Sequence, residues 1–367
     1  MPPLRQVTLQ GDFYTMGVQH GKAHAEDIRA LTEERIQLCT EAAWTGREIS
    51  RERVLEIAAE CIPLNEAYAP DLMQELRGVA HATHLSLEEV LITNGFTDFV
   101  DTIYNADPTP AATPELSHTD CTTFMVNGKT TIEGHSFIGQ TWDMHATATP
   151  FVILLRGKPQ HAPHFLTLTV TGCVGMIGMN DAGIAVGINN LMGGDGKRGV
   201  MWNLVIRKIL MQTNIEDALA CITEAELAGG HNYVLMDSHG NGYDVEAMTT
   251  IKRVQPFKTE HYAHANRCLY PETGVVERDL DDNTVDDSDT RRSRAMELLT
   301  RRPITPDVLK SITADRSDGV YSICSMSEPP FYSETCGAAI MRPGTREFWA
   351  VWGLPNKNAY EYFQVND

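Results

Sequence analysis

The sequence changes character at the segment Asp120-Cys121-Thr122-Thr123-Phe124. A proline-rich run, residues 105–120, precedes the cysteine, and the β-branched and apolar residues 122–126 follow it directly, before an Asn-Gly turn. Proline interrupts helices and central strands, whereas β-branched and aromatic residues favour strands. The sequence therefore predicts that Cys121 lies where a loop enters a strand.

The two sides of this junction differ in periodicity. Before it, after a short strand at residues 7–10, apolar spacing and capping residues predict helices at 16–43, 54–62, 72–82 and 86–91. After it, the expected strands are residues 122–126, 131–138, 151–155, 165–170, 175–179, 184–188, 233–236, 243–246, 251–254, 338–341 and 347–351. Helices are expected at 200–211, at 215–224, from a Thr290 cap to residue 299, and at 306–313. Strands in runs and helices in runs predict a layered α+β fold rather than βαβ winding.

Charge and hydropathy restrict the class of partner. The formal net charge of −19 opposes binding to nucleic acid or to anionic membranes, since both favour a basic surface. The N-terminal residues contain no apolar signal core, and no apolar run reaches the ~20 residues that span a bilayer. We therefore expect a soluble, cytoplasmic protein.

The eight cysteines are widely and irregularly spaced, and none forms a C-x-x-C pair. In a long chain without a secretion signal, this pattern predicts reduced thiols, most of them packed in the core. An H-E-x-x-H pattern and a G-x-G-x-x-G between a strand and a helix are also missing, so neither a metal nor an organic cofactor is expected. The aspartate-rich residues 277–289 lack the glycine and glutamate of an EF-hand and are expected to form a solvated loop.

Cys121 has two interpretations on its residues alone. It is either a buried strand cysteine or a nucleophile that becomes a new N-terminus when the Asp120–Cys121 bond breaks. In the second case the freed α-amine, with an ordinary pKa of about 7.7–8.0, serves as the base for the thiol of the same residue. The thiol itself could break the bond by attacking the Asp120 carbonyl and forming a thioester. No histidine lies in a motif that marks it as the base instead.

Five fragments follow one another along nearly the whole chain: the glycine-containing residues 11–21, Cys121-Thr122-Thr123, Gln140-Thr141-Trp142-Asp143, the turn of residues 178–186, and His264-Ala265-Asn266. Together they resemble the acyl-coenzyme A:6-aminopenicillanic acid acyltransferase (isopenicillin N acyltransferase) family of N-terminal-nucleophile cysteine hydrolases. The resemblance implies a four-layered αββα sandwich that forms one structural domain. It also implies autoproteolysis between Asp120 and Cys121. A helical segment, residues 1–120, would then stay associated with a β-rich catalytic segment, residues 121–367.

The resemblance assigns roles to particular side chains. Cys121 is the expected nucleophile, and Asp143 is the carboxylate expected to hold and orient the new α-amine. Asn266 is expected to donate a side-chain N–H to the tetrahedral oxyanion. Thr123 and Gln140 are expected to line the site.

The resulting expectation is a self-processing amidohydrolase that cleaves a linear amide C–N bond through an acyl-cysteine, with a small-molecule amide as its substrate. Two alternatives stay open. One is an acyltransferase that passes the acyl group to an amine, and the other is an uncut protein of the same fold that binds without catalysis. The expected partner is the chain's own cleaved N-terminal fragment, and a homodimer of processed units is a further arrangement that the sequence allows.

Overall fold

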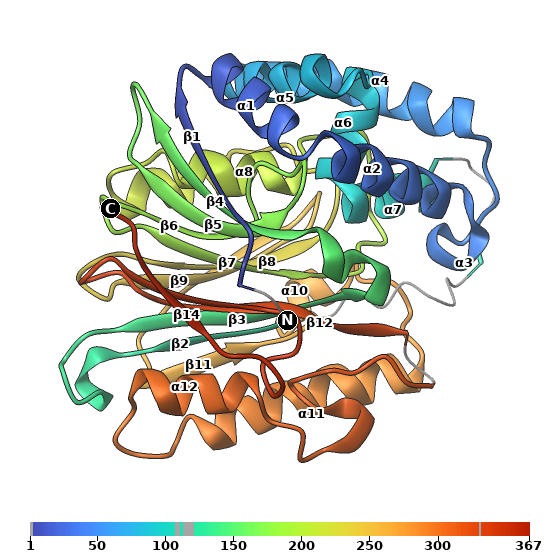
Figure 1. Ribbon diagram of the computed structural model, residues 1–367. Coiled ribbons are helices and arrows are strands. Elements are labelled where there is room, and N and C mark those ends of the chain that lie inside the picture. Colours follow the sequence, from blue (N-terminus) through green and yellow to red (C-terminus); the bar gives the residue numbers. More distant parts are fainter. Residues whose placement is uncertain (1–2, 107–110, 113–120, 330–331) are drawn as a thin grey trace.

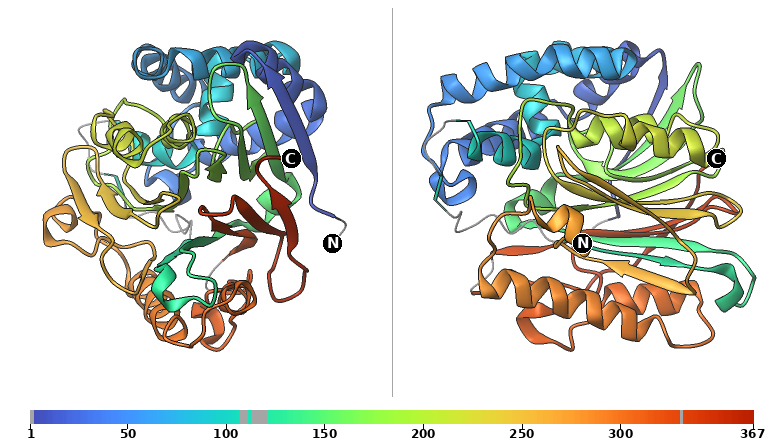
Figure 2. Two further views of the ribbon diagram at one scale, coloured as in Figure 1. Left: turned by 90° about the vertical axis from the view of Figure 1, so that its left-hand side faces the viewer. Right: turned by 180° about the vertical axis from the view of Figure 1, so that it is seen from behind.

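Four layers of secondary structure make up the fold. The computed structural model describes residues 3–106, 111–112, 121–329 and 332–367. Within them, helices cover the outer face of an eight-stranded sheet, a six-stranded sheet lies beneath it, and further helices cover the opposite outer face (Figure 1). The two sheets are stacked face to face in both further views (Figure 2). The expected layered α+β fold, with its αββα order, is therefore confirmed.

The eight-stranded sheet runs in the order β1-β4-β5-β6-β7-β8-β9-β10. Its strands are β1 (Gln6–Gly11), β4 (Val152–Pro159), β5 (Phe165–Val170), β6 (Ile177–Asn180), β7 (Ala185–Asn190), β8 (His231–Met236), β9 (Gly242–Ala247) and β10 (Lys252–Pro256). β1 pairs with β4 in parallel, and the other neighbours pair antiparallel. The N-terminal segment thus supplies an edge strand to a sheet that is otherwise built from residues after position 121.

The six-stranded sheet runs in the order β11-β2-β3-β12-β13-β14 and is antiparallel throughout. Its strands are β2 (Cys121–Val126), β3 (Phe137–His145), β11 (His261–His264), β12 (Ser333–Arg342), β13 (Glu347–Trp352) and β14 (Glu361–Gln364). The strand predicted at residues 131–138 is wrong. A 3-10 turn, η1 (Gly128–Thr130), follows β2, and Gly134 has a positive φ of 74°, so the strand begins later. The observed β3 therefore contains both Gln140 and Asp143.

The upper helical layer contains α1 (Phe13–Ala23), α2 (Ala25–Thr40), α3 (Ala42–Thr45), α4 (Arg51–Tyr68), α5 (Pro70–Thr83), α6 (Leu87–Asn94), α7 (Phe96–Tyr104), α8 (Trp202–Ile209) and α9 (Ile215–Thr223). The capping box that begins α6 and the Asn214 cap of α9 are as predicted. The single helix predicted at 16–43 is instead three helices. His24 leaves the helical conformation with a φ of −136°, and Glu41 leaves it with a ψ of 130°. Helix α7 was not predicted.

Two glycines explain how closely α1 and α5 pack. A Cβ atom on Gly17 would lie 1.9 Å from the carbonyl oxygen of Glu75, and one on Gly78 would lie 2.2 Å from that of Tyr14. Only a residue without a side chain permits this approach of two backbones. The glycine-containing fragment at residues 11–21 therefore serves helix packing in the N-terminal segment.

The lower helical layer contains α11 (Asp282–Leu298) and α12 (Pro306–Thr313), and the short α10 (Pro271–Gly274) follows β11. The prediction of a solvated loop over residues 277–289 is wrong for most of that run. Helix α11 begins there with Asp281 as its cap, well before the expected Thr290 cap. Carboxylates near a helix N-terminus are stabilised by the exposed N–H groups and the helix dipole. As a result, Asp287 and Ser288 lie inside a helix and are buried.

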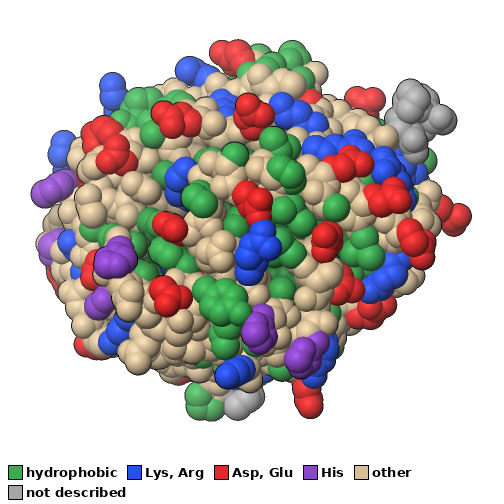
Figure 3. All heavy atoms as spheres, turned by 90° about the horizontal axis from the view of Figure 1, so that it is seen from above, with side chains coloured by type: hydrophobic (Ala, Val, Ile, Leu, Met, Phe, Trp, Pro, Cys, Tyr) green, Lys and Arg blue, Asp and Glu red, His purple; other side chains and the backbone are tan. Residues whose placement is uncertain are grey.

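The described residues contain no helix with both the length and the apolar character that crossing a membrane requires. Acidic and basic side chains are intermixed over the upper helical face of the molecule (Figure 3). This surface does not present the continuous basic area that phosphate-rich partners favour.

Candidate active site

Cys121 is the first residue of β2, a strand that lies between β11 and β3. Across the sheet it pairs with Trp142 of β3, and its own side chain is 5% exposed. The strand begins one residue before the predicted start, so the cysteine stands where the sequence expected the chain to enter the sheet. Asp120, the other residue of the expected cleavage site, lies outside the described residues.

Three side chains from distant parts of the chain hold the backbone of Cys121. Its N–H donates to Oδ1 of Asn266 at 2.8 Å. Its carbonyl oxygen accepts from Nδ2 of Asn189 at 2.9 Å and from Nη1 of Arg291 at 2.9 Å. The peptide nitrogen and oxygen of the expected nucleophile are thus both fixed by tertiary contacts.

Arg291 is fully buried on α11, and its charge is paired within the same helix. Its Nε and Nη2 donate to one oxygen of Asp287 at 2.9 and 2.7 Å, while Nη2 also donates to Oδ1 of Asn266 at 3.0 Å. A buried guanidinium is tolerated when its N–H groups are hydrogen-bonded to a carboxylate. Sequence reasoning missed this residue. The available signal was an Asp and an Arg four residues apart, the spacing of helical neighbours. We expected the Asp to lie in a loop and the Arg to follow a helix cap at Thr290.

Asn266 follows the end of β11 and contacts several residues of the site. Its backbone N–H donates to Oγ of Ser288 at 2.9 Å, and its side-chain Nδ2 donates to the carbonyl oxygen of Asn190 at 3.0 Å. Its Oδ1 accepts from the nitrogen of Cys121. This nitrogen becomes the α-amine if the chain is cut, so Asn266 could hold the amine through Oδ1 as well as donate through Nδ2. The expected oxyanion role of Nδ2 stays a prediction.

A buried pair of His264 and Glu246 lies just before Asn266 in the chain. His264 faces Oε1 of Glu246 at 2.9 Å through Nε2 and the carbonyl oxygen of Ala265 at 2.7 Å through Nδ1. Burial lowers the pKa of His264, but the hydrogen bond to Glu246 and the charges of Asp244 and Glu246 outweigh it and raise the pKa above its ordinary value. Both ring nitrogens face acceptors, an arrangement that favours the protonated ring, which donates in two directions. The contact with Ala265 lies directly before Asn266 in the chain.

Asp143 lies on β3 next to Trp142 and is fully buried. Its backbone pairs with Thr335 of β12. Burial is the main cause that raises the pKa of the Cys324 thiol to about 11, and the negative charge of Asp143 adds to it. Asp143 and Cys121 border the same cavity, but the contact between Asp143 and an α-amine stays a prediction.

Thr123 and Gln140 lie in the contact between the two sheets. Oγ1 of Thr123 donates to Oδ1 of Asn189 at 2.7 Å, which turns the amide nitrogen of Asn189 toward the carbonyl of Cys121. Gln140 bridges the sheets by donating to the carbonyl oxygen of Ile188 and accepting from its N–H, at 2.5 and 2.7 Å. Neither residue is among those that line the cavity beside Cys121. The contact of Thr123 connects β2 to β7, and the contacts of Gln140 connect β3 to β7.

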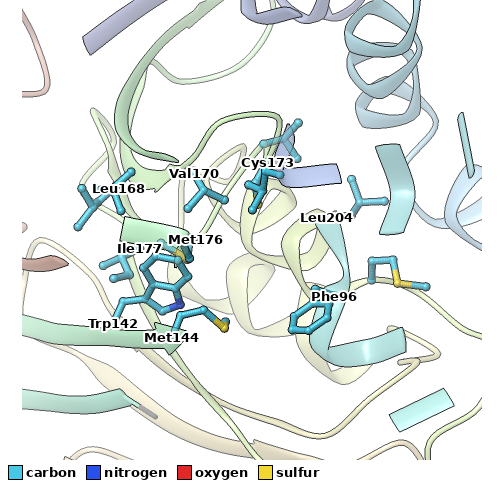
Figure 4. Packing of buried hydrophobic residues seen from close by; sticks show 14 of the residues in the cluster. Phe96, Trp142, Met144, Leu168, Val170, Cys173, Met176, Ile177 and Leu204 are labelled. Atoms are coloured by element: carbon cyan, nitrogen blue, oxygen red, sulfur yellow. The ribbon is translucent and has the colours of Figure 1, made fainter. Parts of the chain in front are cut away.

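The cavity beside Cys121 has a volume of about 30 Å³, which suits water rather than an acyl chain. Its described lining consists of Thr97, Cys121, Trp142, Asp143, Met144, Met176, Ile188, Asn190, Trp202 and His231. Figure 4 shows Trp142, Met144 and Met176 close together above β3. A larger groove of about 580 Å³ lies at α4, α8 and α9, and it contains none of the residues that contact Cys121. We therefore take the smaller cavity as the candidate site.

The described residues contain no group of three or more His, Cys, Asp or Glu side chains arranged to hold a metal ion. All eight cysteines are free thiols in the structure, and seven of them are buried. Burial raises the pKa of most of these thiols, for example that of Cys61 to about 11.

Comparison with known proteins gives the family. The family model for acyl-coenzyme A:6-aminopenicillanic acid acyl-transferase matches residues 130–357, which is more than half of the chain. The acyl-coenzyme A:6-aminopenicillanic-acid-acyltransferase 40 kDa form of Emericella nidulans is 23% identical over 320 residues, covering 87% of this chain and 84% of that protein. An uncharacterized protein of Archaeoglobus fulgidus is 24% identical over 253 residues, covering 63% of this chain. The aligned part spans only 41% of the length of that protein.

Two solved structures are also similar. A mutant of the conjugated bile acid hydrolase from Clostridium perfringens aligns with a TM-score of 0.45 at 11% identity, covering 67% of this chain and 92% of that chain. Penicillin V acylase from Agrobacterium tumefaciens aligns with a TM-score of 0.43 at 12% identity, covering 67% of this chain and 87% of that chain. The match to the family model rests on the chain's own sequence over most of residues 121–367: this chain belongs to the acyl-coenzyme A:6-aminopenicillanic acid acyl-transferase family.

Proposed function

We propose that this protein is a self-processing amidohydrolase that cleaves a linear amide C–N bond through an acyl group carried on Cys121. The observation that carries the proposal is the set of contacts around one buried cysteine at the start of a strand. The backbone of Cys121 is fixed by Asn266, Asn189 and Arg291, and Cys121 borders a cavity. Membership of an acyl-transferring family supports acyl chemistry at this position.

In the processing step, Sγ of Cys121 attacks the carbonyl carbon of Asp120 and forms a thioester. The C–N bond between the two residues breaks, and the nitrogen takes a proton to become the α-amine of Cys121. Water then hydrolyses the thioester, which releases the Asp120 carboxylate and returns the thiol. The fragments 1–120 and 121–367 stay together, because the first supplies β1 to the eight-stranded sheet and the helices that cover it.

Turnover uses the same thiol on an external amide. The α-amine accepts the thiol proton, Sγ attacks the substrate carbonyl, and the tetrahedral oxyanion is stabilised by N–H donors such as Nδ2 of Asn266. Asp143 stabilises the ammonium group that this proton transfer produces, and that ammonium then gives its proton to the leaving amine. The leaving amine departs with a proton, and water completes hydrolysis of the acyl-cysteine.

Acyl transfer is the second candidate. The relative from Emericella nidulans carries an acyltransferase name, and this observation favours an amine as the acceptor. Both reactions share the acyl-cysteine and differ only in whether water or an amine reaches it. Incubating the acylated enzyme with and without an added amine, and measuring acid and new amide as products, separates them.

The test of the proposal begins with denaturing gel electrophoresis of the purified protein. Two fragments support self-processing if the chain is cut between residues 120 and 121, so that the larger fragment begins Cys-Thr-Thr. A single uncut band supports the third alternative, a binding protein of this fold that lacks catalysis. Any other N-terminal sequence on the large fragment contradicts the mechanism.

A further inference from the structure

Part of the lining of the cavity beside Cys121 is a cluster of polar side chains that the proposed chemistry does not use. Thr97 comes from α7, Asn190 from the end of β7, Trp202 from the first turn of α8, and His231 from the start of β8. Four elements therefore meet at one end of the cavity. The rest of the lining includes the apolar side chains of Trp142, Met144, Met176 and Ile188.

His231 is held rigidly and is 2% exposed. Its Nε2 lies 3.2 Å from the hydroxyl of Thr97, and its ring centre lies 5.6 Å from that of Trp202. Its Nδ1 lies 3.6 Å from a carboxyl oxygen of Asp98, beyond hydrogen-bonding distance. The other oxygen of Asp98 accepts from the backbone N–H of Trp202 at 2.7 Å, so the same carboxyl group anchors the start of α8.

Burial disfavours charge on the groups at this end of the cavity. It lowers the pKa of His231 to about 3 and raises the pKa of Asp98 well above its ordinary value. A neutral imidazole offers one donor and one acceptor. No lysine or arginine is among the described residues of the lining, and the carboxylate of Asp143 lies at the border of the same cavity. The proposed ammonium group of Cys121 is already paired with Asp143, so a negatively charged substrate group would lose its hydration without gaining an unpaired cation.

Several polar atoms of this cluster still need partners. Oδ1 of Asn190, Nε1 of Trp202 and Nδ1 of His231 are buried and have no hydrogen-bond partner among the described residues. Most buried polar groups in folded proteins are hydrogen-bonded, and exceptions that gather at one site call for a ligand or water. The set includes an acceptor on Asn190 and a donor on Trp202. A ligand group that both donates and accepts matches it.

Cys121 and this polar cluster border the same cavity. This position determines which part of a substrate the cavity can bind. After attack, the acyl part remains covalently attached to Cys121, whereas the amine must leave. The part that stays must lie beside the thiol, where this cavity is.

Resting on the proposed function, we propose that this cavity binds the acyl part of the substrate. That acyl part is uncharged and mainly apolar, and it carries a hydroxyl or amide group that hydrogen-bonds to the cluster of Thr97, Asn190, Trp202 and His231. The apolar stem lies along Trp142 and the two methionines. Methionine side chains are flexible, so these walls can yield to an acyl chain that the present volume does not admit.

Three anilides of equal chain length test the inference: hexanoyl, its terminally hydroxylated analogue, and adipoyl para-nitroanilide. We expect the processed enzyme to have a kcat/KM for the hydroxylated substrate at least about five- to tenfold above that for hexanoyl, as one added hydrogen bond provides. The adipoyl anilide, which ends in a carboxylate, is expected to be the slowest. Thr97→Val and His231→Leu are expected to reduce the preference for the hydroxyl to about twofold or less.

Thr102→Val is the matched control. It removes a buried threonine hydroxyl from the same helix, one that donates to the carbonyl oxygen of Lys197 at 2.9 Å, and it leaves the cavity lining intact. The preference for the hydroxylated substrate must survive this change. Thermal unfolding of each variant identifies any that fails to fold, and His231→Gln, which keeps a polar group, provides a second reading at that position.

The outcomes distinguish this inference from the proposed function. If adipoyl is the fastest substrate, or if Thr97→Val keeps the full hydroxyl preference, the inference is wrong. The chain would then still be cut, and mass spectrometry would still find an acyl group on Cys121. A chain that stays in one piece and gives no acylated Cys121 overturns both.

Discussion

Arg291 donates to the carbonyl oxygen of Cys121 at 2.9 Å although 170 positions separate the two residues. The same guanidinium donates to Oδ1 of Asn266, which in turn accepts from the nitrogen of Cys121. A closed set of hydrogen bonds thus surrounds the backbone of the expected nucleophile. These bonds fix the nitrogen and oxygen of a residue that borders the cavity, an arrangement suited to a thiol whose attack requires a precise orientation.

The first prediction concerns the nucleophile. Cys121→Ala is expected to give a folded chain that stays uncut and has no amidase activity, because one thiol serves both reactions. Gel electrophoresis, circular dichroism and an amide-hydrolysis assay measure the three properties. Cys268→Ala, which removes a half-buried thiol outside the cavity lining, is the control and should be cut normally. Amide hydrolysis by Cys121→Ala would rule out the acyl-cysteine.

The second prediction concerns the buried pair of Arg291 and Asp287. Arg291→Met removes the cation from a buried carboxylate and is expected to lower the free energy of unfolding by about 3–5 kcal/mol. Arg291→Lys keeps the charge but cannot reach Cys121, Asn266 and Asp287 together, so it should slow processing while costing less stability. Chemical denaturation and the rate of chain cutting measure the two effects. Equal stability of the methionine variant and the wild type would contradict the pairing.

The third prediction separates two functions of Asn266. Asn266→Asp keeps an oxygen that can accept from the nitrogen of Cys121, but it removes the Nδ2 donor. We expect kcat to fall by about 10²–10³-fold with little change in KM, since an oxyanion exists only near the transition state. Asn266→Ala removes both contacts and should also impair chain cutting. A rise in KM alone in either variant would argue against the oxyanion role.

The fourth prediction is a loss of stability in mild acid that depends on His20. Burial lowers its pKa to about 3, and its Nε2 accepts from the N–H of Gly172 at 3.0 Å. The unfolded chain binds this proton near pH 6.5 and the folded chain does not. Stability therefore declines as the pH falls below about 6.5 and continues to decline toward about 3, with a loss of about 2 kcal/mol from this group at pH 5.

Thermal or urea unfolding at about pH 7.5 and about pH 5 measures this loss. The variant His20→Gln keeps an acceptor for Gly172 but does not titrate, so its stability should drop less between the two conditions. Carboxylates contribute equally to both proteins, and the difference isolates His20. Parallel pH profiles for wild type and variant would contradict the assignment.

The fifth prediction concerns the docking of the N-terminal segment. In Gly17→Ala the new Cβ would lie 1.9 Å from the carbonyl oxygen of Glu75, so α1 and α5 must separate. We expect a loss of about 1–3 kcal/mol, the range for overpacking a closely packed contact, and faster release of the N-terminal fragment after cutting. Gly274→Ala is the control, because no atom lies within 4 Å of its added Cβ. Size-exclusion chromatography of the processed protein detects the released fragment.

Local features followed from the sequence where neighbouring residues decide the conformation. The capping box before α6, the cap of α9 and the entry into β2 at Cys121 involve contacts within a few residues, and the structure has all three. Errors arose where the local signal was ambiguous. The acidic run resembled a loop, yet its aspartates are also suitable residues for the first turns of α11.

The sequence by itself determined the family, the layered α+β fold and the position of the candidate nucleophile. These rest on the order of short fragments, on periodicity and on local turn chemistry. Only the tertiary structure decided which distant residues surround Cys121, among them Asn189, Arg291 and His231. Their arrangement depends on how the sheets stack and on which face of each helix is turned inward. Both are set by packing over the whole molecule, which no stretch of neighbouring residues encodes.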